Sequence, residues 1–137
     1  MKANLPTREP ETIKYWQSID LYGKMQDVRE GNEKFSFHDG PPFSNGNIHM
    51  GHALNKILKD FINKYKAMQG YRISYVPGWD NHGMPIESAI IKKNKLDHKN
   101  MSVSEFRTAC RDFAKDFVDI QMTSFKRLGV LGDWDNP

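Results

Sequence analysis

The chain carries two histidines three residues apart, His49 and His52, at the end of a glycine- and proline-rich run that starts at Gly40. We expect a rigid turn to become a helix there. A helix start offers unpaired N–H groups and the positive end of the helix dipole, so anions bind to it. At this spacing two imidazoles can face the same way and add hydrogen-bond donors. The run therefore predicts a phosphate-handling site.

Two common phosphate motifs do not describe this run. Gly46 and Gly51 have the G-x-x-x-x-G spacing of a Walker loop, but His52 stands where that motif needs lysine, and the chain has no G-x-G-x-x-G fingerprint. Two alternatives stay open. One histidine caps the helix while the other is merely exposed, or the pair binds zinc together with Asp80 or His82, although no H-E-x-x-H is present.

Two further groups of residues suit a small-molecule pocket. Gly40, Pro41 and Pro42 form a stiff wall with few free N–H groups, which suits a pocket that selects by shape, although a plain turn explains them nearly as well. Later in the chain, the Asp80 carboxylate could hold an ammonium group while Trp79 lines the pocket. A turn-forming or helix-capping aspartate is the equal alternative.

A β-α-β unit would bring these groups together. Short strands are predicted at Phe35–Phe37 and Ile73–Val76, the first ending near Asp39 and the second stopped by Pro77. With a helix between them, parallel pairing and a right-handed crossover are expected. Ligands bind at the carboxyl edge of such a sheet. The loops that meet at this edge contain four of the five histidines: His38, His49, His52 and His82.

The predicted helices frame this unit. The one between the strands is amphipathic and ends at Gly70. Its apolar face consists of Leu54, Ile57, Leu58, Phe61, Ile62, Tyr65 and Met68, and its polar face of Lys56, Lys59, Asp60, Asn63, Lys64 and Lys66.

The remaining segments are predicted as follows. Residues 1–33 form an extension with one helix that has Pro10 in its first turn, a helix runs from Pro85 to about Asn94, and a polar linker covers 96–101. A last helix is capped by Ser102 with Glu105 and ended by Gly129.

Composition narrows the function classes. The net charge of +3 is compatible with a polyanionic partner without indicating one, and the lysines at 92–99 favour a solvated face over nucleic-acid binding. The single cysteine, Cys110, excludes an internal disulfide framework and a four-cysteine zinc site, and is expected as a core thiol. No signal peptide or membrane-spanning apolar run is present, so we expect a cytoplasmic protein. A two-stranded sheet is thin for a complete α/β domain, so we expect a part of a longer protein.

These motifs resemble those of a known family. Pro41-Pro42, Asn45-Gly46 and His49-Met50-Gly51-His52 resemble the "HIGH" signature of class I aminoacyl-tRNA synthetases, with Met50 in place of the familiar isoleucine. The stretch from Pro77 to Glu87 resembles the second-strand loop of the isoleucyl enzymes, and residues 127–134 are also similar to them. The resemblance extends from about residue 10 to residue 137.

The resemblance implies an α/β fold, namely the first half of a Rossmann-type catalytic domain at residues 34–137. It implies activation of isoleucine with ATP and Mg²⁺, followed by transfer to the 3′ end of tRNA(Ile), by an enzyme expected to be monomeric and without a membrane partner. His49 and His52 would be catalytic, and no residue is assigned to a metal. The ATP site would comprise Pro42, Asn45, Gly46, His49, Gly51 and His52, with Gly51 against adenine, and the isoleucine site Gly40, Pro41, Trp79 and Asp80.

Parts of the family pattern do not occur in the 137 residues: the KMSKS lysine loop, the editing domain and the anticodon-binding domain. We therefore expect negligible aminoacylation by these residues alone. Two rival functions stay open. One is another adenylyl-transferring enzyme that acts on a small carboxylate, and the other is a non-catalytic RNA-binding or interaction module that uses the same half-fold.

Overall fold

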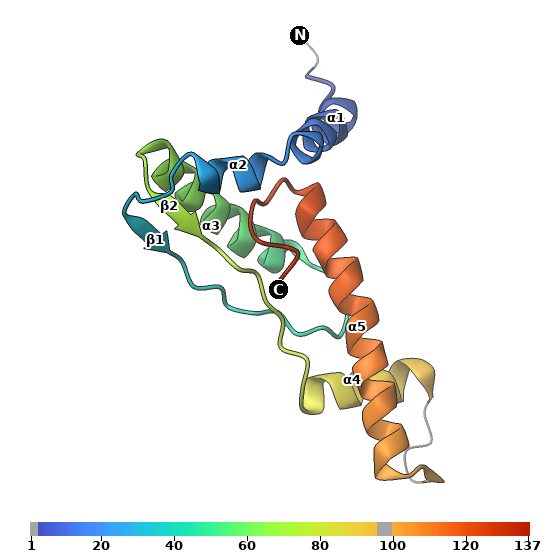
Figure 1. Ribbon diagram of the computed structural model, residues 1–137. Coiled ribbons are helices and arrows are strands. Elements are labelled where there is room, and N and C mark those ends of the chain that lie inside the picture. Colours follow the sequence, from blue (N-terminus) through green and yellow to red (C-terminus); the bar gives the residue numbers. More distant parts are fainter. Residues whose placement is uncertain (1–2, 96–99) are drawn as a thin grey trace.

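The computed structural model of the chain describes residues 3–95 and 100–137. The polar linker predicted at 96–101 falls mostly outside the described residues. Figure 1 shows the arrangement of the elements. In chain order they are α1 (Leu5–Ser18), α2 (Leu21–Asp27), β1 (Lys34–Ser36), α3 (Met50–Met68), β2 (Arg72–Ser74), α4 (Met84–Asn94) and α5 (Val103–Arg127).

The predicted β-α-β unit is confirmed. β1 and β2 pair in parallel, with Phe35 opposite Ile73, and α3 connects them. Each strand is three residues long and begins one residue earlier than the sequence predicts. The predicted helix ends are also confirmed, because Gly70 and Gly129 adopt positive φ angles of 96° and 78° directly after the last turns of α3 and α5.

The prediction of a single N-terminal helix is wrong, because the segment forms α1 and α2. Asp20 separates them in a left-handed conformation with φ 47°, and its carboxylate accepts a hydrogen bond from the N–H of Gly23 at 3.2 Å. This aspartate therefore caps a new helix. Pro10 lies inside α1 rather than in its first turn, because the helix begins at Leu5 and Pro6 already occupies the start.

Two small apolar clusters hold the elements together. One joins α3, β2 and the residues after α5, and consists of Ala67, Ile73, Tyr75 and Val130. The other joins α4 to α5, and consists of Ile86, Ile90, Phe113 and Ala114. Cys110, which we expected as a core thiol, is partly buried and packs against this cluster. In Figure 1 the segment after α5 folds back beside α3.

The helix α3 is oriented opposite to the usual rule, by which an amphipathic helix buries its apolar face. Its buried residues are Lys56, Asp60, Asn63 and Ala67. Six apolar side chains of α3 are between 41% and 77% exposed: Leu54, Leu58, Phe61, Ile62, Tyr65 and Met68. We call these six residues the outer α3 face.

Neighbouring irregular backbone explains this orientation. Buried backbone groups outside regular structure need hydrogen-bond partners, and the polar side of α3 supplies them. Asp60 accepts from the N–H of Leu131 at 3.0 Å, and the Lys64 ammonium donates to the carbonyl of Gly129 at 3.0 Å. The polar residues of α3 therefore hold the segment after α5, and the apolar residues face outward.

The outer α3 face predicts self-association of the isolated 137-residue chain, because contiguous exposed apolar surface favours association in water. We expect the double variant Leu58→Glu/Phe61→Glu to remain monomeric at concentrations where the unmodified chain forms larger species in sedimentation velocity. The matched control is Val28→Glu, at an apolar residue that is 81% exposed outside α3. Equal association of the double variant and the unmodified chain would contradict this prediction.

Candidate active site

Two loops follow the strands and lie side by side (Figure 1). The first loop covers residues 37–49 and the second covers residues 75–83. The N–H of Asp80 donates to the carbonyl of Pro42 at 2.9 Å, and the N–H of Ser44 donates to the carbonyl of Asp80 at 3.2 Å. The Ser44 hydroxyl, fully buried, also donates to the Asn81 side-chain oxygen at 2.7 Å. The predicted convergence of the two loops is therefore confirmed.

The histidine pair forms the N-terminal cap of α3. His49 is the capping residue, and its Nδ1 accepts a hydrogen bond from the N–H of Gly51 at 3.1 Å. The Nδ1 of His52 accepts from the N–H of His49 at 3.3 Å. The two rings stack, with centroids 3.8 Å apart and planes 22° apart. Both histidines face the same way, and both take part in the cap.

This cap determines which imidazole nitrogens remain for a ligand. A neutral imidazole that accepts at Nδ1 carries its proton on Nε2. Partial burial, followed by the nearby His49 and Lys56, lowers the pKa of His52 and favours its neutral form. The pair therefore offers two Nε2–H donors, whereas the N–H groups of His49 and Gly51 are already donated to the rings.

Gly51 lies directly under one of these rings. A Cβ at this position would lie 2.9 Å from the Cε1 atom of His49, closer than real Cβ atoms approach. The flat ring that packs against Gly51 in this structure is therefore the His49 imidazole. Glycine is needed here for the cap itself.

The second loop places Asp80 and Trp79 beside the first loop. The Oδ1 of Asp80 accepts from the N–H of His82 at 3.3 Å, so the turn role considered in the sequence is present. The indole Nε1 of Trp79 donates to Gln121 Oε1 at 3.0 Å. Trp79 and Asp80 are both partly exposed.

The remaining predicted residues line the first loop. Gly40 and Pro41 are exposed and Pro42 is buried. The side chain of Asn45 donates to the carbonyl of Pro85 at 3.4 Å, and its own carbonyl accepts from Lys93 at 3.2 Å. These two contacts tie the loop to α4.

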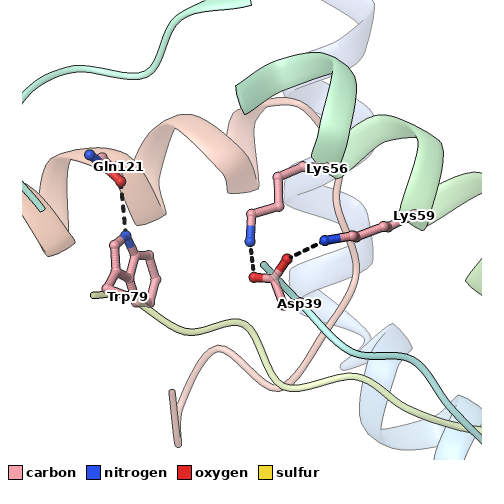
Figure 2. A network of polar contacts seen from close by, with 5 residues as sticks. All are labelled: Asp39, Lys56, Lys59, Trp79 and Gln121. Atoms are coloured by element: carbon pink, nitrogen blue, oxygen red, sulfur yellow. Dashed lines mark hydrogen bonds and ion pairs between the residues drawn. The ribbon is translucent and has the colours of Figure 1, made fainter. Parts of the chain in front are cut away.

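A buried ion cluster anchors the start of the first loop to α3 (Figure 2). The Asp39 carboxylate pairs with Lys56 through one oxygen and with Lys59 through the other, the latter at 2.9 Å. The Asp39 and Lys56 side chains are 4% and 3% exposed. Burial alone would raise the pKa of Asp39, but the hydrogen bonds and charges of the two lysines outweigh it and lower that pKa. Burial lowers the pKa of Lys56.

The sequence model of the family described as "tRNA synthetases class I (I, L, M and V)" matches residues 11–137. The chain belongs to this family. Similar full-length proteins are named isoleucine–tRNA ligase. Identity is 60% for that of Natranaerobius thermophilus, 58% for that of Carboxydothermus hydrogenoformans and 53% for that of Caldicellulosiruptor bescii. Each match includes all of this chain and 15% of the relative, so the chain spans about one seventh of their length.

A solved structure agrees with the class I fold. It is the ternary complex of the agnB2 leucyl enzyme LeuRS of Agrobacterium radiobacter K84 with tRNA and LeuAMS. Its TM-score to this chain is 0.75 at 21% identity, over 98% of this chain and 15% of the other. The predicted incomplete Rossmann-type fold is therefore confirmed.

A zinc site and a membrane-spanning helix were also considered from the sequence. Within residues 3–95 and 100–137, no group of three or more His, Cys, Asp or Glu side chains is arranged to hold a metal ion, so the zinc alternative lacks a ligand set. No helix of the same residues is both long and apolar enough to cross a membrane. His38 and His82 are exposed.

Sequence reasoning missed several residues that contact the two loops of the candidate site. Gln121 is 1% exposed and reaches both loops. Lys56 and Lys93 were each assigned to polar or solvated faces, yet Lys56 is buried against Asp39 and Lys93 contacts the first loop. The one available signal was Gln121 itself, a polar residue between the apolar positions Phe117 and Phe125 of α5.

We expect Asp39→Asn to lower the free energy of unfolding by about 3–5 kcal/mol, because it leaves buried lysine charges without a counter-charge. The Asp39 pKa is lowered in the folded state, so its stabilising contribution is present above its ordinary value of 3.8 and is lost as the pH falls through the lowered value. Urea unfolding measures both the loss of stability and its pH dependence. Each substitution is made in the Leu58→Glu/Phe61→Glu chain, which we expect to remain monomeric. The control is Asp112→Asn, whose ion pair with Arg111 is 65–75% exposed. Equal stability of the two variants would refute the role of the cluster.

Proposed function

We propose that the protein containing this chain is an isoleucine–tRNA ligase, and that the two loops form part of its adenylate-forming site. Class I synthetases use ATP, and this reaction has two steps. The isoleucine carboxylate attacks the α-phosphorus of ATP, forming isoleucyl adenylate and releasing pyrophosphate. The terminal tRNA hydroxyl then attacks the acyl carbon and releases AMP.

The observation that carries the proposal is the combination of 53–60% identity to isoleucine–tRNA ligases along the whole chain with the joined loops. The second loop, which resembles a loop of the isoleucyl enzymes, pairs directly with the loop that leads to the histidine pair. A site for adenylate formation needs the amino acid and the α-phosphate to meet at one place.

The histidine pair is proposed to bind the phosphates of ATP. The Nε2–H groups of His49 and His52 are the donors left by the cap, and the stacked rings hold them in a fixed orientation. Negative charge grows on the α-phosphate oxygens as the carboxylate attacks. Donors that are already in place stabilise that charge without reorganisation. Pro42, Asn45, Gly46 and Gly51 complete the proposed ATP site.

The second loop is proposed to bind isoleucine. The Asp80 carboxylate keeps one oxygen on the N–H of His82 and carries the negative charge that an α-ammonium group requires. Gly40 and Pro41 in the first loop, with the Trp79 indole, would border the apolar side chain. One methylene changes binding by only about 1–3 kcal/mol, so discrimination against valine at this site is modest.

Mg²⁺ is usual for the reaction of this family. It commonly binds through substrate phosphates with few protein ligands. Because the described residues do not provide a metal-holding group of their own, no step is assigned to a protein-bound metal here. Magnesium supplies charge neutralisation for the phosphates when ATP brings it.

Five further properties belong to the same proposal. Residues 1–33 serve as an extension to the catalytic unit at 34–137, the complete enzyme acts as a monomer in the cytoplasm, and tRNA(Ile) is its partner. The 137 residues alone would lack activity, because no lysine loop neutralises the departing pyrophosphate. Family membership supports the tRNA partner, and the 15% coverage of the full-length relatives supports the lack of activity of these residues alone.

The direct experiment is amino-acid-dependent ATP–pyrophosphate exchange by the complete gene product, meaning the protein encoded by the whole reading frame that contains this chain. We expect exchange with isoleucine, followed by charging of tRNA(Ile). Exchange without tRNA charging would favour the other adenylyl-transferring enzyme. Salt-dependent tRNA binding without any exchange would favour the RNA-binding module.

We expect His52→Ala in the complete gene product to lower the rate of adenylate formation by about 10²–10³, because one transition-state donor is lost. Rapid-quench measurement of the first turnover gives this rate. His38→Ala, at an exposed histidine of the same loop, serves as the control. A His52→Ala rate close to that of the control would remove His52 from the phosphate site.

We expect Asp80→Asn to weaken isoleucine binding by about tenfold or more, because a hydrogen bond to a charged group contributes about 1.5–3 kcal/mol. The substitution keeps the oxygen that accepts from His82 and removes only the charge. ATP affinity should change little, and Asp116→Asn on the exposed side of α5 is the control. Equal weakening of both ligands in calorimetry would show that Asp80 has only a turn-forming role.

A further inference from the structure

A single buried amide on α5 connects both loops of the candidate site. Gln121 is 1% exposed. Its Oε1 accepts from the Trp79 indole N–H at 3.0 Å, and its Nε2 donates to the carbonyls of Phe43 at 3.0 Å and Gly46 at 2.7 Å. Figure 2 shows Gln121 reaching Trp79 from the helix. Both amide hydrogens therefore go to the first loop, and the oxygen serves the second.

The chemistry of these three bonds sets strict requirements on this side chain. An amide is planar, so its donors and its acceptor keep a fixed relation to each other. Two carbonyl acceptors require two N–H donors, and an indole N–H requires an acceptor. Glutamine satisfies all three partners, whereas glutamate and methionine of similar size do not.

Two of these three contacts, at Gly46 and at the Trp79 indole, lie apart from the backbone links between the loops. The backbone pairing joins Pro42 and Ser44 to Asp80. Gln121 donates to Phe43, between Pro42 and Ser44, and also further along the first loop to Gly46, three residues before the histidine cap. In the second loop it holds the Trp79 indole rather than the backbone.

We propose that Gln121 is a positioning residue for adenylate formation: its amide sets the placement of the phosphate-binding loop relative to the isoleucine-binding loop. This inference rests on the proposed function. The histidine donors and the Asp80 carboxylate, which would bind the charged groups of the two substrates, make no hydrogen bond to Gln121 and remain when it is changed. The rate of the step that joins the two substrates depends on their relative placement, and a shift of about 1 Å can cost about 10² in rate.

Two variants of the complete gene product test this role, together with one matched control. Gln121→Met keeps the volume and removes all three hydrogen bonds. Gln121→Glu keeps the acceptor for Trp79 and removes both donors. The control is Gln17→Met, the same exchange at an exposed glutamine of α1. Steady-state isoleucine-dependent exchange gives kcat and the KM for each substrate, and thermal melting monitors folding.

For Gln121→Met we expect kcat to fall by about 10- to 100-fold while each KM changes by less than about threefold. Each loop binds its own substrate separately, whereas the reaction between the two substrates depends on how the loops are placed relative to each other. The control should match the unmodified protein. A folded Gln121→Met with an unchanged kcat overturns the proposal. Equal loss through both KM values with kcat retained also overturns it, because binding alone would then depend on Gln121.

The Gln121→Glu variant adds a pH-dependent readout. A carboxyl group buried beside two carbonyls has a raised pKa, and its protonated form regains one donor for them. The ratio of its exchange rate to that of the unmodified protein should therefore rise as the pH falls from about 8.5 to about 6. A flat or falling ratio overturns the proposal. This readout does not depend on Gln121→Met, so it holds even if that variant does not fold.

The remaining outcomes separate this proposal from the proposed function. If neither variant folds, Gln121 serves the core alone and the positioning role is wrong. If the unmodified protein shows no isoleucine-dependent exchange, the proposed function fails first. Exchange by the unmodified protein together with unchanged variants leaves the function intact and removes only the role of Gln121.

Discussion

Parallel pairing of β1 with β2 is the constraint on which the candidate site depends. Three residues on each side form the regular ladder, but hydrogen bonding resumes beyond the strands, where Asp80 pairs with Pro42 and Ser44. Because the strands are parallel, the loops that follow them leave the sheet at the same edge. One edge therefore carries the histidine cap on one loop and an acidic residue on the other, and the proposed function rests on this arrangement.

Buried polar groups, rather than a large apolar core, hold the loops in this arrangement. Asp39 with its two lysines anchors the beginning of the first loop, and Gln121 binds its later part. Burial of such groups is unfavourable unless their hydrogen bonds are satisfied. The orientation of α3 follows from the same need, since its polar residues serve irregular segments and its apolar residues face outward.

Local signals in the sequence were sufficient for much of this structure. Alternation and breakers located both strands, Ser102 with Glu105 formed the predicted capping box, and Gly70 and Gly129 ended their helices. The convergence of the loops followed from parallel topology alone. All of these depend on residues close in the chain or on a general rule of β-α-β units.

The parts that sequence reasoning missed depend on contacts between distant residues. Amphipathic spacing identified α3 but not which face is buried, because that depends on Leu131 and Gly129 far along the chain. Gln121 forms hydrogen bonds with residues that precede it in the chain by 42 positions (Trp79) and by 78 positions (Phe43). The break at Asp20 was a local signal that went unrecognised, an aspartate able to adopt a left-handed conformation and cap a helix.

The most direct test of the account is a crystal structure of the complete gene product with a non-hydrolysable isoleucyl-adenylate analogue. The account predicts the phosphate-mimicking group within hydrogen-bond distance, about 2.7–3.2 Å, of Nε2 of His49 or His52. It also predicts the ammonium group on the Asp80 carboxylate and unbroken contacts of Gln121 to both loops. An analogue bound away from the histidine pair, or with its ammonium group away from Asp80, would contradict the assignment of the two loops.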